Sequence, residues 1–349
     1  MRIVLDAMGS DHAPGPDVEG GVRAARRFGH EILLVGRREL IEPELAKYPT
    51  AGLPLRLVHA SQVVEMGEHP SQAVRAKPDS SMVVGMRLVR HGEADAFVSA
   101  GNTGGVMAAA LASEGRLGRV KGIQRPALAA VIPGVRGVSL LLDVGANTDC
   151  RPEWLLQFAI MGMIFARNVL GINNPRVGLL SNGEEDIKGN QLVQQTHAMM
   201  RRLELNFVGN VEGKDILRNM ADVIVSDGFV GNVALKTAEG VAATLMSTLR
   251  SEIKARPLAT LGGLLARPAF RAVAKKLDPR EYGGAPLLGV NGVVIIGHGR
   301  SDGLAVENAV GAAIHAVESN LVSAIQQDIQ DTLTVLKTMA DMGEEAPSA

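Results

Sequence analysis

The sequence predicts an α/β protein with a largely parallel sheet that helices cover on both faces. Five short apolar runs are each followed by a polar or glycine-rich loop and then by a helical pattern. This alternation is typical of βαβ units, whose strands are parallel. Hydrophobic residues make up 46% of the chain and aromatic residues only 3%, so the core must consist of Ala, Val, Leu, Ile and Met. We expect one α/β unit over residues 1–330 and a helix end with a disordered tail over 331–349.

The clearest unit is centred on residues 139–149. Leu140, Leu141 and Leu142 form a run typical of a strand buried on both faces. Polar residues follow at once, and Pro152 then suits the first turn of a helix, where its missing N–H is not needed. Because ligands of such sheets bind beyond the carboxyl ends of the strands, we expect all five polar loops at one edge, and the chemistry there.

The remaining elements follow the same two patterns. Further strands are predicted at residues 2–6, 30–35, 55–58, 94–98, 129–132, 176–180, 223–225 and 293–296. Helices are predicted at residues 18–28, 80–89 and 106–112, from about 191, after 232, and from 304 nearly to the end. The last helix carries an apolar i, i+4 stripe that packs on the domain or on a second subunit, at Leu321, Ile325, Ile329, Leu333 and Leu336.

The glycine-rich loop at residues 99–105 is the best anion site on physical grounds. It lies between a strand and a helix, so several N–H groups are free and the helix dipole favours negative charge. Asn102 or Thr103 can cap that helix. The alternative is tight packing of a small-residue turn. The loop lacks the G-x-G-x-x-G spacing, and no G-x-x-x-x-G-K-[ST] pattern occurs in the chain.

Two other loops carry polar side chains with open roles. His12 could bind an anion or move a proton, or it could cap the next helix together with Asp11. Asn232 is a plausible N-cap, and Lys236, one turn later, could point back at an anion.

The loop at residues 182–190 is strongly charged. Glu184, Glu185 and Asp186 could suggest a divalent metal, but no spacing motif supports one and Lys188 sits among them. We expect no metal here, and instead an ion-paired loop that grips a substrate or partner.

Arginines flank the central strand in sequence. Arg125 and Arg151 are candidate phosphate partners, and the alternative for each is a surface ion pair.

Residues 250–280 are predicted to form an amphipathic helical protrusion. Leucines alternate with arginines and lysines there, and prolines and glycines break the segment into short helices. Such a surface can lie on an anionic membrane, or it can bind a partner or a second copy of the chain.

Several classes of function are excluded. The net charge of −1 gives no reason to expect nucleic acid. The single cysteine, Cys150, excludes an internal disulfide and fits a reducing cytoplasm. The chain begins with a strand rather than a signal peptide, and no apolar run is long enough to span a bilayer. Residues 299–303 match G-x-S-x-G, but no strand follows Ser301 to carry a hydrolase triad, so we reject that alternative.

Taken together, these loops resemble the bacterial acyl-carrier-protein:phosphate acyltransferases of phospholipid synthesis. The matching segments occur in the family's order, over residues 5–14, 99–104, 142–147, 182–185, 188–190, 209–213, 227–232 and 282–292. The resemblance covers about residues 1–318. Ser10 stands where glycine is more usual, and the helix beyond Leu321 is longer than expected.

The resemblance implies a Rossmann-like three-layer α/β/α fold and a cytoplasmic homodimer, peripheral at the inner face of the membrane. It implies that an acyl carrier protein thioester reacts with inorganic phosphate to give an acyl phosphate, which a membrane glycerol-3-phosphate acyltransferase then uses. No cofactor is implied. The alternatives are an oxidoreductase of the decarboxylating dehydrogenase type and a non-enzymatic membrane-surface scaffold.

The site residues are assigned from residue type and position. The catalytic candidates are His12, Asn102, Asn232 and Lys236. The substrate-binding candidates are Gly9, Ser10, Gly101, Thr103, Gly104, Asp143, Asn147, Asn182, Lys188, Asp227, Gly228, Gly284, Leu287, Leu288 and His298. Among these, Leu287 and Leu288 are expected to line an apolar groove for the acyl chain, together with residues 258–273.

Overall fold

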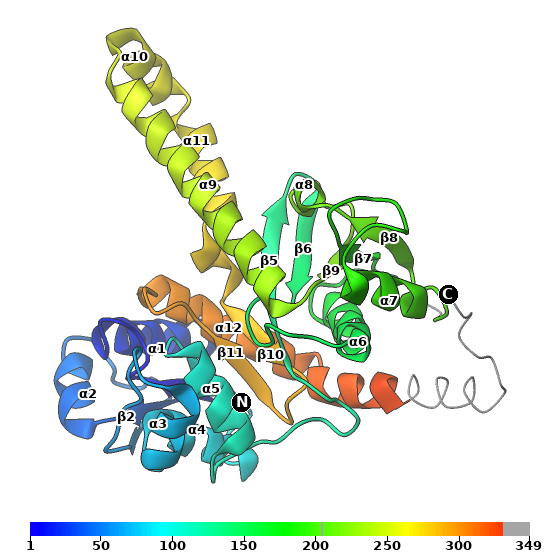
Figure 1. Cartoon of the computed structure of the whole chain (residues 1–349). Helices are drawn as coiled ribbons and strands as arrows, with labels where there is room; N and C mark the ends of the chain where they lie inside the picture. The colour runs from blue at the N-terminus through cyan, green and yellow to red at the C-terminus, as the bar shows by residue number, and fades with distance from the viewer. Residues whose placement is uncertain (204, 331–349) are drawn as a thin grey trace.

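The computed structural model describes residues 1–203 and 205–330 and is built on one continuous sheet of eleven strands in the order β3-β2-β1-β4-β11-β10-β5-β6-β9-β7-β8 (Figure 1). The strands are β1 (Arg2–Asp6), β2 (Glu31–Gly36), β3 (Leu55–His59), β4 (Ala96–Ser99), β5 (Ala127–Gly134), β6 (Gly137–Leu142), β7 (Val177–Leu180), β8 (Phe207–Val211), β9 (Val223–Val225), β10 (Ala285–Leu288) and β11 (Val293–Ile296). The helices are α1 (Gly15–Phe28), α2 (Arg38–Leu45), α3 (Pro70–Ala76), α4 (Ser81–Arg90), α5 (Thr103–Ala112), α6 (Pro152–Asn168), α7 (Gln191–Met200), α8 (Gly213–Ile216), α9 (Gly228–Lys254), α10 (Pro257–Leu265), α11 (Arg267–Lys276) and α12 (Gly303–Glu318).

Helices cover both faces of the sheet, as predicted. Successive residues of a strand point to opposite faces. Leu140 and Leu142 accordingly pack with α1, α6 and α12 on one face, whereas Leu141 packs in the cluster that contains α4 and α5 on the other. The three-layer α/β/α fold and the two-faced burial of this strand are therefore confirmed.

Strand direction reverses in the middle of the sheet. β1, β2, β3, β4 and β11 are parallel to one another, whereas β10 is antiparallel to both β11 and β5, and β6 is antiparallel to β5. β9, β7 and β8 continue parallel to β6. The carboxyl ends of β6, β7 and β9 therefore face the opposite edge from those of β1, β4 and β11. The expectation that all five polar loops share one edge is wrong, because three antiparallel steps separate the two parallel groups.

Residues 285–288 form a strand, which is not among the strands predicted from the sequence. β10 pairs through Ala285 and Pro286 with β11 and through Leu287 and Leu288 with β5. Because β10 pairs through only two residues with each neighbouring strand, it is too short to show a periodic pattern in the sequence.

The protrusion is longer than predicted. α9 alone has 27 residues, and with α10 and α11 it forms a helical arm that projects from the rest of the chain (Figure 1). Leucines are exposed at its tip: Leu258 is 86% and Leu265 79% exposed. Among the described helices, none is long and apolar enough to cross a membrane.

The C-terminal helix packs on the domain. Residues 321–330 are helical, and Leu321, Ile325 and Ile329 are buried in the core. The rest of the predicted stripe, Leu333 and Leu336, and the tail predicted over 331–349 lie outside the described residues.

Candidate active site

Three loops meet where β1, β4 and β11 end. The N–H of Asp11 donates to the carbonyl of Gly299 at 2.7 Å, and the N–H of Gly297 donates to the carbonyl of Ser99 at 2.8 Å. A Cβ atom on Gly9 would lie 2.9 Å from the backbone nitrogen of Gly101, so only glycine allows these two loops to approach so closely. The structure therefore brings together the candidates Gly9, Ser10, His12, His298 and the 99–104 loop.

The N-terminus of α5 offers free hydrogen-bond donors. The Asn102 side chain accepts from the N–H of Gly105 at 3.0 Å, and its carbonyl accepts from Val106 at 2.9 Å. Two N–H groups of the first turn, those of Thr103 and Gly104, remain without an acceptor among residues 1–203 and 205–330. Free N–H groups and the helix dipole together favour negative charge at this helix end.

Asn102 itself has no free polar atom for a substrate. Its Nδ2 donates to the carbonyl of Met66 at 2.8 Å and to that of Glu68 at 3.4 Å. Asn102 thus caps α5 and ties it to the 66–68 segment, which makes it a positioning residue rather than a donor to the transition state.

Two buried carboxyl groups lie beneath these loops, and no pattern in the sequence indicates them. Ser99 Oγ donates to Asp6 at 2.7 Å, and Ser10 Oγ donates to Asp17 at 2.6 Å. Burial raises the pKa of both groups, that of Asp17 to about 7, to which the neighbouring charge of Asp6 also contributes. The other oxygen of Asp17, Oδ1, is buried without a hydrogen-bond partner.

His12 and His298 are exposed at the rim of this group of loops. Ser301 donates its hydroxyl to the carbonyl of His298 at 2.5 Å, and Asp302 caps α12 by accepting from Ala305 at 3.0 Å. The G-x-S-x-G match is thus a helix cap and not a nucleophile elbow.

Asp143 organises the second group of loops, after β6 and β9. Its carboxylate accepts from the backbone N–H groups of Leu128, Gly145, Ala146 and Asn147 at 2.7–3.2 Å, and from Asn147 Nδ2 at 2.9 Å. Burial raises the pKa of Asp143, while these donors oppose the rise. A Cβ atom on Gly228 would lie 3.0 Å from this carboxylate and 2.7 Å from the carbonyl of Asn147, so glycine is required there. Asp143 and Asn147 therefore hold the loop in shape.

The N-terminus of α9, unlike that of α5, is already satisfied. Gly228 donates to the carbonyl of Asn147 at 2.7 Å, Phe229 and Val230 to Asp227 Oδ1 at 2.9 Å, and Gly231 to the carbonyl of Asp227 at 3.0 Å. Asn232 is exposed, 3.9 Å from the position of a Cβ atom on Gly145. Lys236 does not point back at this helix end, because its ammonium pairs with Glu239 at 2.8 Å.

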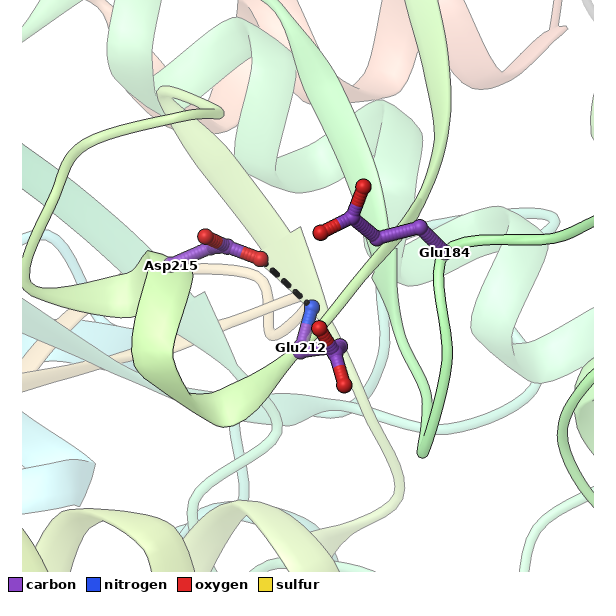
Figure 2. Close-up of side chains that lie close together, drawn as sticks. All are labelled: Glu184, Glu212 and Asp215. Atoms are coloured by element: carbon purple, nitrogen blue, oxygen red, sulfur yellow. Dashed lines mark hydrogen bonds between the residues drawn. The ribbon is translucent and has the colours of Figure 1, made fainter.

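The charged loop after β7 is ion-paired, as expected. Glu184, Glu212 and Asp215 point toward one another in Figure 2, with ligand atoms within 4.8 Å. The Lys214 ammonium pairs with Glu212 and lies 3.2 Å from Glu184, so a protein cation offsets part of the negative charge of the group. Asn182 accepts from the N–H of Gly189 at 2.9 Å, and Lys188 is exposed beside Gly183.

Leu287 and Leu288 do not line an acyl groove. Each is 2% exposed, within the central strand β10. The cavity that they border has a volume of about 10 Å³, which is room for a single water molecule at most. Gly284 precedes them, where a Cβ atom would lie 2.8 Å from the carbonyl of Ile296.

Cys150 is poorly suited to act as a nucleophile. Burial, and then the charge of Asp143, raise the pKa of its thiol to about 12, so it stays protonated at neutral pH.

Fold and site together define an α/β protein in which one helix N-terminus keeps free N–H donors. The chain belongs to the family described as fatty acid synthesis protein, whose model matches residues 1–324. It is 54% identical to the phosphate acyltransferase of Heliobacterium modesticaldum, over 94% of this chain and 98% of that protein. It is 49% identical to the phosphate acyltransferase of Geobacter sulfurreducens, over 99% of both chains. The family predicted from the motifs is thereby confirmed.

Solved structures share the fold at low sequence identity. The EutD phosphotransacetylase from Staphylococcus aureus has a TM-score of 0.59 and 17% identity, over 91% of this chain and 94% of its own. A branched-chain phosphotransacylase from Enterococcus faecalis has a TM-score of 0.58 and 16% identity, over 91% of this chain and 99% of its own.

Replacing Asp17 by Asn should change how stability depends on pH. The folded-state pKa of Asp17 is about 7 and the unfolded-state value about 3.9, so the folded protein binds the extra proton between them. The wild type therefore loses stability as the pH rises between these two pKa values. The variant has no titrating group at position 17 and does not lose stability in this way. Between pH 5 and 8, the free energy of unfolding of Asp17→Asn should rise relative to wild type by about 2–3 kcal/mol. Urea unfolding of both proteins at the two pH values measures this change. The same difference in free energy of unfolding between variant and wild type at both pH values would contradict the prediction.

Proposed function

We propose that this protein transfers a fatty acyl group from an acyl carrier protein thioester to inorganic phosphate, giving an acyl phosphate for phospholipid synthesis. Near-full-length relatives named phosphate acyltransferase support the reaction class. The observation that carries the proposal within the structure is the open N-terminus of α5, with its free donors at Thr103 and Gly104.

The chemistry needs no activated side-chain nucleophile. A phosphate oxygen attacks the thioester carbonyl, the C–S bond of the tetrahedral oxyanion breaks, and the carrier thiolate leaves and takes up a proton. Phosphate held by N–H donors supplies the nucleophile itself, which agrees with the protonated Cys150.

Several polar side chains remain candidates to stabilise the two anions. His12 and His298 lie on loops beside α5, and the exposed amide of Asn232 has no hydrogen-bond partner among the described residues. Lys236 would first have to leave Glu239. Loss of one oxyanion donor typically lowers the rate by about 10²–10³.

The helical arm supports the further proposal of a cytoplasmic homodimer that binds the membrane peripherally. Its apolar side chains are exposed along α9 and at the tip, at Val233, Val241, Leu245, Leu258, Leu261, Leu264 and Leu265. Basic residues accompany them on α11, which suits an anionic lipid surface. A membrane position would bring the acyl phosphate to a membrane glycerol-3-phosphate acyltransferase.

The test of the reaction is release of carrier thiol from a long-chain acyl carrier protein, measured with and without inorganic phosphate. Wild-type protein should release thiol only with phosphate and form acyl phosphate in equal amount; phosphate-independent release would reject the proposal.

Thr103→Asp should raise the KM for phosphate about 10-fold or more, because a carboxylate at the α5 N-terminus repels the anion. Thr103→Asn is the neutral control and should stay near wild type. Equal KM values in the two variants would remove α5 from the phosphate site.

Leu265→Glu should weaken binding to vesicles that contain anionic lipid, because it places a carboxylate on an apolar surface at the tip of the arm. Val135→Glu is a matched control, since Val135 is 78% exposed and Leu265 is 79% exposed. Vesicle flotation measures both, and Val135 lies in the turn between β5 and β6, outside the helices of the arm. Equal binding by the two variants would contradict membrane contact through the tip.

A further inference from the structure

Two arginines share one aromatic ring beside the Asp143 loop. The guanidinium carbons of Arg125 and Arg151 lie 4.8 Å and 5.9 Å from the ring centroid of Trp154, the only tryptophan in the sequence. We call these three residues the Arg–Trp–Arg cluster.

The ring is held in place by hydrogen bonds. Trp154 Nε1 donates to the side-chain oxygen of Gln124 at 2.8 Å, and the N–H of Gln124 donates to Gln157 Oε1 at 2.8 Å. Gln157 is buried, and its Nε2 donates to the carbonyl of Gly122 at 3.0 Å. The indole is therefore a rigid platform for the two guanidinium groups.

Neither guanidinium is neutralised. Both arginines are exposed, and within the part of the chain that the structure describes neither guanidinium has a hydrogen bond or an ion pair. The exposed carboxylates of Asp149 and Glu153, each two residues from Arg151, pair with neither guanidinium. Two like charges near one ring repel each other, so an anion close to them is favoured. A guanidinium that stacks through its face keeps its N–H edge for a phosphate group.

The cluster adjoins the second group of loops rather than α5. Pro126, next to Arg125, accepts a hydrogen bond from Asn147 Nδ2 at 2.8 Å, and Cys150, next to Arg151, donates to the carbonyl of Asn147 at 3.4 Å. The two arginines therefore flank the loop that Asp143 shapes, away from the free donors of Thr103 and Gly104.

We propose that the Arg–Trp–Arg cluster binds the phosphodiester of the carrier protein's phosphopantetheine arm. This inference rests on the proposed function, because a carrier-bound thioester brings this phosphate with it. The arm separates its phosphate from the thioester by a long flexible chain, so the phosphate must be held at a distance from the reacting carbonyl. An exposed pair of guanidinium groups outside the α5 site can hold the phosphate apart from the reacting carbonyl.

Trp154 reports this binding without turnover. Free 4′-phosphopantetheine should change the intrinsic fluorescence saturably, whereas pantetheine, which lacks the phosphate, should not at the same concentrations. Arg125→Gln/Arg151→Gln should weaken the apparent affinity about 10–100-fold, as expected for the loss of charge-assisted hydrogen bonds. Arg26→Gln/Arg202→Gln removes two exposed guanidinium groups elsewhere and should leave the affinity unchanged. No response to phosphopantetheine, or equal loss in both double variants, would overturn the proposal.

Turnover of two small acyl donors separates this proposal from the proposed function. Acyl-phosphopantetheine should be the better donor for wild type, and the Arg125→Gln/Arg151→Gln variant should reduce its kcat/KM to that of acyl-pantetheine. An increase in the KM for inorganic phosphate with both donors would overturn the proposal in favour of a co-substrate site. A loss seen only with intact acyl carrier protein would overturn it in favour of a protein-docking face. A saturable fluorescence change with 4′-phosphopantetheine would support the binding site even if no donor gave phosphate-dependent thiol release. The absence of that release would reject the proposed acyl transfer.

Discussion

The reversal of strand direction between β11 and β6 is the constraint on which the arrangement of polar residues depends. Three successive antiparallel pairings turn the second parallel group against the first. Loops after β1, β4 and β11 consequently gather around α5, and loops after β6 and β9 gather around Asp143. A single parallel sheet would have placed them all at one edge, so the reversal explains why the candidate residues form two groups.

The two groups differ in how many donors they keep free. At α9 the helix N-terminus is filled by Asp227 and by the carbonyl of Asn147, and the neighbouring Asp143 accepts from four backbone N–H groups. At α5 the cap residue Asn102 leaves two donors open. The carboxyl groups of Asp6 and Asp17 lie below the same loops, and burial disfavours their charged forms. Reduced negative charge beneath α5 is compatible with binding of an anion there.

Much of the fold could be predicted, because its signals are local. The Leu140–Leu142 run, the glycine-rich turn at 99–105 and the proline that opens α6 each indicate their structure within a few residues. The central strand β10 has no such signal, since it is four residues long and contains Pro286. The pairs Asp6–Ser99 and Ser10–Asp17 could not be found either, because residue type does not show which polar groups a fold buries together. Leu287 and Leu288 were misassigned for the same reason: an apolar residue after a glycine-rich loop suits a groove and a core equally well.

The central claim is that phosphate binds at the N-terminus of α5. A crystal structure of the protein with bound inorganic phosphate tests it most directly. The claim predicts phosphate oxygens within hydrogen-bond distance of the N–H groups of Thr103 and Gly104, with Asn102 still bonded to the 66–68 segment. Phosphate bound instead at the N-terminus of α9, with Asp227 displaced from its cap, would contradict it.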